Sequence, residues 1–380
     1  MVTMKQVGLN VAADPLMSLA YVGVKGGMVI VSADDPGPIS SQTEQDTRRF
    51  ADFCRIPVFD PSSPEEAYKM IGEAFEYSEK YNTPVLFRPT TRVCHAYASI
   101  DNCDSPSPKK YEGFVKDSKK WVIFPRLSFA NHIMIEKRNV EIGKDFSTYS
   151  ANKAEGGNSE KVVVTSGISY AYTKECLKDY PDVKLIKIAT AYPFPEDFVL
   201  SSLEGAKEVL CIEELSPFIE EQILKLAGKH GLQLKVSGKL DRKVQAGGEN
   251  STDKIAAILG DFLGKDFTAE GYDLSDAPAL PVRPPVLCAG CPHRASFYAV
   301  KQAMKGRKAY FCGDIGCYTL GNAMPLDMVD TCLCMGAGIT MAQGFNHTDS
   351  DGVCFGFVGD STFFASGITG VVNAVHNNAD

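Results

Sequence analysis

The sequence predicts an α/β protein made of three successive domains, each built on a parallel β-sheet. Two observations carry this prediction: short apolar runs alternate with helical patterns in three stretches, and polar, charge-mixed stretches separate them. The predicted domains cover residues 1–100, 159–265 and 287–380, and the predicted linkers cover residues 101–158 and 266–286. A chain of 380 residues is also too long for one ordinary hydrophobic core.

The first domain is predicted from a strand–helix–strand order. Residues 26–37 form an apolar, β-rich run that closes in a turn sequence, Asp-Asp-Pro-Gly. Residues 62–81 begin with Ser-Ser-Pro and two acidic residues, and their apolar side chains keep helical spacing. Residues 83–93 form the next strand-like run. In the linker that follows, residues around 127–140 form an amphipathic helical pattern.

The middle domain shows the same alternation of strand-like runs and helical patterns. The runs KVVVTSG, VKLIKIAT and EVLCIEE are strand-like, and helical patterns lie near 168–179 and 217–229. The turn TSGIS lacks the second and third glycines of a dinucleotide-binding fingerprint, so a tight structural turn is expected there.

Composition excludes several classes of protein. The net charge of −8 argues against nucleic acid or an anionic membrane as a partner. The chain has no apolar run long enough to span a membrane and no signal-peptide pattern, so we expect it in the reducing cytoplasm. Clustered cysteines there indicate metal or redox ligation. Seven of the 12 cysteines lie near the C-terminus: Cys288, Cys291, Cys312, Cys317, Cys332, Cys334 and Cys354.

One candidate site follows the apolar run 352–358, which is typical of a strand buried on both faces of a parallel sheet. Asp360 comes directly after it, at the strand end where open α/β sheets bind ligands. Its carboxylate suits Mg²⁺, but an aspartate here could equally cap the next helix. That helix is predicted from an apolar face formed by Ile368, Val371, Val372 and Val375.

A second glycine-rich turn contains Gly336, Ala337 and Gly338. Small residues between a strand and a helix can leave backbone N–H groups for an anion, or can simply allow close helix packing. A diphosphate bound at this turn and linked through Mg²⁺ to Asp360 would use both the N–H groups of this turn and the carboxylate of the other.

The cysteines leave three interpretations open. Cys288 and Cys291 form a C-x-x-C pair, and Cys317 follows the glycine-rich turn 313–316. Cys288, Cys291, Cys312 and Cys317, with His293 as a substitute, could hold zinc, while an iron–sulfur cluster tolerates their irregular spacing better. Buried free thiols are the third interpretation, best suited to Cys312, Cys332, Cys334 and Cys354. His293 could be a base, a hydrogen-bond donor to substrate or an exposed side chain.

Taken together, the motifs resemble a known family. CAGCPHR, GDIGCYTLG, CMGAGI and GDSTFF, in that order, are similar to the thiamine-diphosphate domain of the 2-oxoacid:ferredoxin oxidoreductases, in particular the α subunit of those that act on indolepyruvate. VGLNVAADPL, ADDPGPISSQTEQD and TPVLFRPTTRV resemble the pyrimidine-binding domain of that subunit. TSGISYAY and AYPFPE resemble its middle, transketolase C-terminal-like domain.

The resemblance implies a set of site residues. Asp360 resembles the family's Mg²⁺ ligand. The three cysteines Cys288, Cys291 and Cys317 resemble ligands of a 4Fe–4S cluster, for which the sequence shows no evident fourth ligand. His293 is the candidate catalytic residue. The residues implied in binding thiamine diphosphate are Gly313, Asp314, Gly316, Gly336, Gly338, Gly359, Asp360, Ser361 and Thr362.

The implied reaction is oxidative decarboxylation of an aryl-pyruvate to an aryl-acetyl-CoA, with electrons passed to ferredoxin, as in aromatic amino acid degradation. The implied partners are a β subunit, ferredoxin, coenzyme A and the 2-oxo acid, in an oligomer. Two other functions stay open: a non-oxidative thiamine-diphosphate decarboxylase or transferase, and a non-enzymatic partner subunit that binds zinc or another metal.

The resemblance also implies an internal fragment. The family's activating glutamate lies upstream of VGLNV, and its metal-binding asparagine lies beyond the residues that follow Asp360. We therefore expect the first and last domains to be truncated and the chain by itself to turn over weakly.

Overall fold

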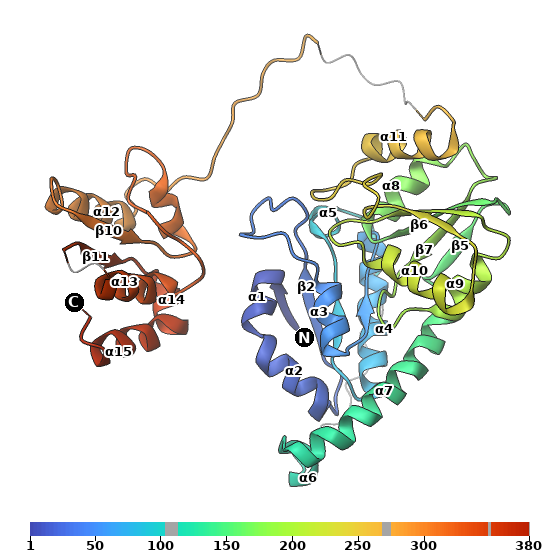
Figure 1. Cartoon of the computed structure of the whole chain (residues 1–380), viewed down its shortest axis with the longest axis horizontal. Coiled ribbons are helices and arrows are strands. Elements are labelled where there is room, and N and C mark those ends of the chain that lie inside the picture. The colour runs from blue at the N-terminus through green and yellow to red at the C-terminus, as the bar shows by residue number, and fades with distance from the viewer. Residues whose placement is uncertain (103–112, 268–274, 349–350, 380) are drawn as a thin grey trace. The chain divides into compact units, whose positions relative to one another are not determined.

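The computed structural model describes residues 1–102, 113–267, 275–348 and 351–379 (Figure 1). The chain divides into two compact units, Met1–Tyr272 and Asp273–Asp380. The division falls inside the stretch 266–286, which the sequence predicts as a linker.

The first unit contains two sheets. The first sheet is entirely parallel, in the order β1-β2-β4-β3, and the second has the order β5-β7-β6-β8-β9, in which only β5 is antiparallel to its neighbour. The strands are β1 (Val2–Lys5), β2 (Val29–Ala33), β3 (Val58–Phe59), β4 (Val85–Phe87), β5 (Lys153–Glu155), β6 (Lys161–Ser166), β7 (Lys184–Ile188), β8 (Glu208–Ile212) and β9 (Lys235–Ser237). The predicted α/β class with mostly parallel sheets is confirmed.

Helices cover both sheets. Within the described residues, no helix is both long and apolar enough to cross a membrane. The helices of the first unit are α1 (Gln6–Val11), α2 (Ala13–Val22), α3 (Thr47–Cys54), α4 (Pro64–Tyr81), α5 (Thr91–His95), α6 (Ser118–Trp121), α7 (Pro125–Ser147), α8 (Ile168–Cys176), α9 (Glu196–Ser202), α10 (Phe218–His230) and α11 (Thr252–Leu263).

Local signals explain the bounds of the elements. Helix α4 begins where the Ser63 hydroxyl accepts a hydrogen bond from the N–H of Glu66 at 3.2 Å, and it ends at Asn82, whose φ of +51° is left-handed. At the turn between β6 and α8, Gly167 has a φ of +52°, so the expected tight turn is present.

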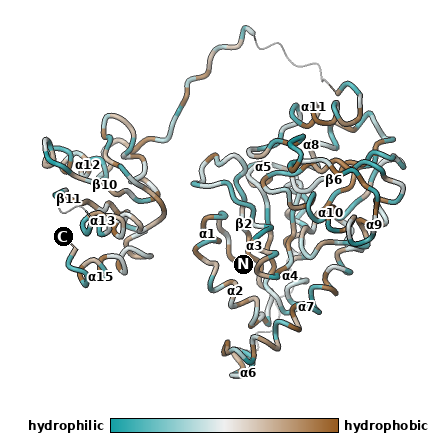
Figure 2. The backbone as a smooth tube through the Cα atoms, viewed as in Figure 1, coloured by the Kyte–Doolittle hydropathy of each residue, from teal (hydrophilic) through white to brown (hydrophobic). Residues whose placement is uncertain are grey.

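The two sheets of the first unit share one core. Ile56 and Leu86 from the first predicted domain lie in the same buried apolar cluster as Val164 and Ile186 from the middle one. Figure 2 colours β6, at the centre of its sheet, mainly as hydrophobic. Backbone bonds also join the two parts: the N–H of Val58 donates to the carbonyl of Tyr192 at 2.7 Å. Because this core is continuous, the two parts form one unit.

Helix α7 occupies most of the first predicted linker. It is longer than the amphipathic pattern at 127–140 indicated, and it runs from α6 past α2 and α4 toward α9 (Figure 1). Its side chains Ile142 and Phe146 are buried, and the Phe146 ring meets the Phe59 ring edge-on at a centroid distance of 5.4 Å. The helix therefore contributes to the core of the first unit.

A buried ionic network lies where strands of the two sheets end. Arg48 pairs with Asp46 at 2.6 Å and with Glu213, just past β8, at 2.8 Å. Arg88, just past β4, pairs with Asp34 at 2.7 Å and with Asp60 at 3.2 Å. All six side chains are buried, so each charge depends on its partners for the solvation that water would supply. They are Asp34, Asp46, Arg48, Asp60, Arg88 and Glu213.

Glu214, beside this network, makes the stability of the first unit depend on pH. Burial raises the pKa of Glu214 from 4.5 to about 7, although its Oε1 accepts a hydrogen bond from the N–H of Asn250 at 2.9 Å. A raised carboxyl pKa means that the folded state holds the proton more tightly than the unfolded state. Its contribution to stability is therefore complete below pH 4.5 and is lost as the pH rises toward about 7.

We expect Glu214→Gln to stabilise the first unit at alkaline pH, since glutamine keeps an acceptor and never ionises. The difference in free energy of unfolding from wild type is expected to be near zero at about pH 4 and up to about 3 kcal/mol at about pH 8. Urea denaturation of both proteins at the two pH values measures it. A difference that does not change with pH would contradict this assignment.

The second unit is built on a two-stranded parallel sheet of β10 (Ala309–Cys312) and β11 (Val353–Gly356). Its helical elements are α12 (Pro292–Ala303), η1 (Cys317–Asn322), α13 (Ala337–Thr348), α14 (Asp360–Thr362), η2 (Phe363–Gly367) and α15 (Ile368–His376).

Two expectations about burial in this unit were wrong. Residues Val353–Cys354–Phe355 of β11 are only half-buried, because the sheet has a single neighbouring strand. The predicted apolar face of α15 is exposed, with Val372 at 64% and Val375 at 72%. The helix packs on α13 instead through Gly370, which lies against Ile339 and Thr340.

Candidate functional site

Three glycine-rich turns meet at the carboxyl ends of β10 and β11. Because Cys312 pairs in parallel register with Gly356, the turns 313–316 and 359–362 leave the sheet at the same edge. Gly338, at the start of α13, packs onto both strand ends. A Cβ atom there would lie 2.8 Å from the carbonyl oxygens of Gly313 and Phe357, so only glycine fits. The structure thus brings Gly313, Gly338 and Gly359 together.

Asp314 connects these turns. Its side chain is 1% exposed; Oδ1 accepts a hydrogen bond from the N–H of Gly336 at 2.8 Å and Oδ2 from the N–H of Gly359 at 2.9 Å. No cation pairs with this carboxylate among the described residues. The charge is therefore stabilised by backbone dipoles, and the carboxylate holds two turns that are far apart in sequence.

This arrangement changes one expectation about backbone groups. The N–H groups of Gly336 and Gly359 are bonded to Asp314 and are not left for a ligand. Gly336 has a φ of +87°, and a Cβ there would lie 2.9 Å from the hydroxyl of Ser366. Glycine is thus required at 336 for backbone conformation and for space.

The turn 359–362 shows which side chains face outward. The helix that begins here is capped by Gly359, with φ −70° and ψ 156°, so the interpretation of Asp360 as the helix cap is wrong. Asp360 and Ser361 are exposed, whereas Thr362 is buried. Among the described residues, no cation or hydrogen-bond donor pairs with the Asp360 carboxylate. It is available to a ligand from solvent.

Gly316 and Thr319 shape the remaining turn. Gly316 has a φ of +127°, and its N–H donates to the Thr319 hydroxyl at 3.3 Å. That hydroxyl donates in turn to the carbonyl of Asp314 at 2.7 Å. Thr319 was not among the predicted site residues, because only the folded turn brings its hydroxyl to Asp314.

His293 lies at the start of α12 between a thiol and an aromatic ring. Its Nδ1 is 3.3 Å from Sγ of Cys291, and its ring centroid is 4.3 Å from that of Tyr318. Tyr318 also stacks against Phe357, two residues before Gly359, at a centroid distance of 5.5 Å. The half-buried imidazole is therefore linked through one aromatic contact to the strand end that carries the glycine turns.

The predicted cysteine ligands are placed separately. Cys288 and Cys317 are exposed and Cys291 is half-buried. Among the described residues, no group of three or more His, Cys, Asp and Glu side chains is arranged to hold a metal ion. Of the cysteines interpreted as buried thiols, Cys312 is buried but Cys334 is exposed, because it lies in the loop that precedes α13.

The chain is similar to curated archaeal proteins along essentially its whole length. It is 39% identical over 98% of its residues to "Indolepyruvate oxidoreductase subunit IorA" of Methanothermobacter thermautotrophicus, covering 61% of that protein. The protein of the same name from Thermococcus kodakarensis is 37% identical over 100% of the chain, which covers 62% of that relative. The one from Archaeoglobus fulgidus is also 37% identical over 100% of the chain, which covers 61% of that relative. The chain thus spans about three fifths of the length of these relatives. No family model matches it.

Among solved structures, one match is a 2-oxoglutarate:ferredoxin oxidoreductase from Magnetococcus marinus. It has a TM-score of 0.48 and 14% identity, and the match covers 69% of this chain and 52% of that one. The resemblance predicted from the motifs is confirmed by the curated relatives: over the stretch that it spans, the chain is similar to the IorA subunits of the indolepyruvate oxidoreductases.

Proposed function

We propose that the chain is part of a thiamine-diphosphate-dependent enzyme that oxidatively decarboxylates indolepyruvate or a related aryl-pyruvate to an aryl-acetyl-CoA. Electrons pass to ferredoxin, and a β subunit completes the enzyme. The observation that carries the proposal is the convergence of the turns 313–316, 336–338 and 359–362 at one sheet edge, in a chain similar to IorA subunits.

The residues at this edge suit the diphosphate and its metal. Asp360 presents an exposed carboxylate without a partner among the described residues, and such an oxygen is a good Mg²⁺ ligand. Gly338 lets the start of α13 pack directly on the carbonyl oxygens of Gly313 and Phe357, at the ends of the same two strands. In this proposal Asp360 holds Mg²⁺, while Ser361 and Thr362 lie beside the diphosphate. When bound, thiamine diphosphate supplies the electron sink that a 2-oxo acid needs to lose CO₂.

The chain's own residues would orient and insulate this chemistry. Asp314 keeps the two turns at a constant separation through its bonds to Gly336 and Gly359. His293, packed on Tyr318, is the candidate for moving a proton near the aromatic cluster. Each role is a proposal that substitution can test separately.

The iron–sulfur cluster stays a prediction. Cys291 contacts His293, which packs on Tyr318, the neighbour of Cys317 in the chain. These contacts link Cys291 to the neighbour of Cys317 and do not include Cys288, so ligation of a cluster by Cys288, Cys291 and Cys317 rests on the resemblance of the motifs and not on this geometry. Iron and sulfide analysis of anaerobically purified protein tests it; zinc in place of iron would support the metal-binding partner subunit instead.

Asp360→Ala in the full-length subunit, assembled with its partner subunit under anaerobic conditions, tests the metal role. With indolepyruvate, coenzyme A, ferredoxin, thiamine diphosphate and Mg²⁺, we expect the rate of ferredoxin reduction to fall about 100-fold or more, because a metal ion contributes several kcal/mol to binding and catalysis. Asp276→Ala, which removes another exposed aspartate of the same unit, is expected to keep the wild-type rate.

Two results would contradict the proposal. One is a wild-type enzyme that oxidises no aryl-pyruvate under these conditions. The other is an Asp360→Ala variant with the wild-type rate and the wild-type requirement for Mg²⁺. Decarboxylation without ferredoxin reduction, in protein that contains no iron, would favour a non-oxidative thiamine-diphosphate enzyme.

A further inference from the structure

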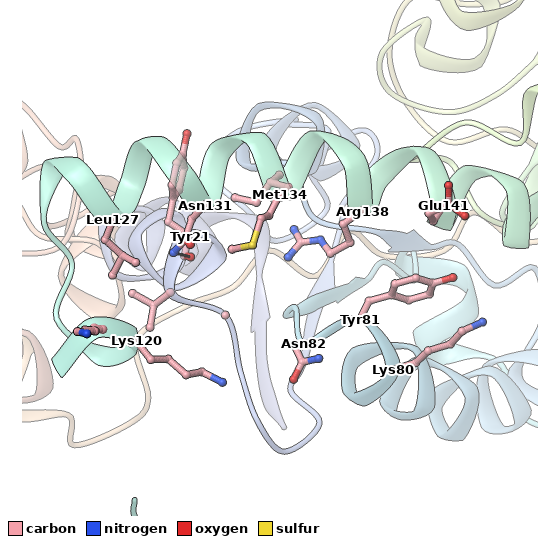
Figure 3. Close-up of a pocket in the computed structure, with 14 residues that line it drawn as sticks. Tyr21, Lys80, Tyr81, Asn82, Lys120, Leu127, Asn131, Met134, Arg138 and Glu141 are labelled. Atoms are coloured by element: carbon pink, nitrogen blue, oxygen red, sulfur yellow. Dashed lines mark hydrogen bonds between the residues drawn. The ribbon is translucent and has the colours of Figure 1, made fainter. Parts of the chain in front are cut away.

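A cavity of about 630 Å³ lies beside helix α7 in the first unit, away from the glycine turns in sequence. Part of its wall is apolar or aromatic, formed by Tyr21, Val22, Leu127, Met134 and Ile135. Figure 3 shows Met134 and Arg138 projecting from α7 into the space that Lys120, Asn82 and Tyr81 border. The volume suits one ring-sized organic molecule.

The charges on its wall are unbalanced. Arg138, Lys119 and Lys120 line the cavity, and no carboxylate pairs with any of them among the described residues. The other charged residues of the wall have partners, Lys80 pairing with Asp145 and Glu141 with Lys144. The cavity therefore carries an excess of positive charge, which attracts an anion.

Arg138 is the unusual member of this group. Its Nη2 donates to the carbonyl of Arg55 at a long 3.4 Å, and its buried Nε has no hydrogen-bond partner among the described residues. Burial lowers the pKa of Arg138 to about 10, and the nearby Tyr192 hydroxyl and Cys54 thiol offset only part of this effect. A guanidinium normally offers its donors as a fork to a carboxylate or a phosphate; among the described residues no carboxylate takes that place at Arg138, which leaves it for an anion in the cavity.

We propose that this cavity binds a small organic anion, whose carboxylate or phosphate oxygens pair with Arg138 and whose apolar ring packs against Tyr21, Leu127 and Met134. Lys119 and Lys120 supply attraction from the exposed side of the cavity. The proposal concerns the first unit alone and does not rest on the function proposed above.

Binding of two probes to the full chain tests this site: phenylacetate, which is a carboxylate, and phenyl phosphate. Trp121 is the single tryptophan of the chain and lies in α6, with the Lys120 ammonium 4.7 Å from its ring centroid, so its fluorescence reports on the cavity. Titration calorimetry supplies an independent dissociation constant. We expect saturable binding of at least one probe and at least about 10-fold weaker binding by Arg138→Gln, because a charge-assisted hydrogen bond is lost.

Matched variants separate this site from general charge attraction. Arg126→Gln removes an exposed charge from the same helix, outside the cavity wall, and is expected to bind as wild type does. Arg138→Lys keeps the charge without the fork and should bind with intermediate strength. Among the described residues no carboxylate pairs with Arg138, so Arg138→Gln should keep the wild-type melting temperature. If it unfolds, Lys119→Gln with Lys120→Gln replaces it, and weaker binding is again expected.

The results of these titrations show which kind of anion binds and which results would contradict the proposal. Binding of phenylacetate alone assigns a carboxylate, and binding of phenyl phosphate alone assigns a phosphate. Equal binding of benzyl alcohol, which has the ring without a charge, would overturn the proposal, as would wild-type affinity in Arg138→Gln or the absence of saturable binding of both probes.

Discussion

Asp314→Asn is expected to weaken the binding of thiamine diphosphate about 10- to 100-fold and to lower the melting temperature of the second unit. The aspartate accepts hydrogen bonds from the N–H groups of Gly336 and Gly359 through its two oxygens. Asparagine has one oxygen, so its NH₂ group must face one of these N–H donors. A buried donor without an acceptor costs about 1–3 kcal/mol, and losing the charge weakens the other bond.

Calorimetric titration of the full-length subunit with thiamine diphosphate and Mg²⁺ measures this effect, and thermal unfolding measures the loss of stability. Asp330→Asn is the matched control, because the exposed Asp330 carboxylate accepts a single bond from the described residues, from the N–H of Phe311 at 2.7 Å. One oxygen of asparagine can replace it. If Asp314→Asn binds the cofactor as tightly as Asp330→Asn does, Asp314 does not position the turns.

Arg48→Met is expected to destabilise the first unit by about 3–5 kcal/mol, which is the usual cost of removing one partner from a buried ion pair. The guanidinium pairs with Asp46 and Glu213 and also donates to the carbonyl of Glu214 at 2.9 Å. Without it, two carboxylates remain buried and lose their compensating charge. Because Arg48 and Asp46 lie at the start of α3 and Glu213 follows β8, the loss affects the packing of α3 against the second sheet.

Arg49→Met supplies the control for this prediction. Arg49 is the next residue in α3 and pairs with Glu221 at 2.6 Å, but both side chains are about one third exposed. A pair of this kind contributes about 1 kcal/mol or less. Urea denaturation of wild type and both variants compares the two sites directly, and equal losses would mean that Arg48 stabilises the unit no more than a surface charge does.

Much of the fold could be predicted because its signals are local. The strand ending at Ala33 was evident from its apolar run, and helix α4 from its apolar periodicity and the cap at Ser63. The short edge strands β5 and β9 were not, since three residues carry too little periodicity to be recognised. The full length of α7 was also missed. Its buried face includes polar residues, so apolar periodicity alone does not reveal that face.

The candidate site also has features that could be predicted from the sequence and features that could not. The order of the motifs around Gly313, Gly336 and Gly359 was sufficient to predict a family, and the curated relatives confirm it. The role of Asp314 could not be predicted, because its partners lie 22 and 45 residues away and are backbone groups without a side-chain signature. The exposure of Val372 and Val375 was also unpredictable, since periodicity identifies an apolar face but not what covers it.

By itself, then, the sequence determined the α/β rhythm, the places of the glycine turns and the family of the chain. These depend on residue types and spacings that act within one turn or strand. The tertiary structure alone decided that Asp314 joins two turns, that Arg48 and Arg88 bury their charges, and that no carboxylate among the described residues pairs with Arg138. Each of these three features involves groups that are distant in the chain and meet only when the sheets and helices pack. The electrostatic energy of a charged side chain depends on the groups packed around it, so the sequence alone does not give it.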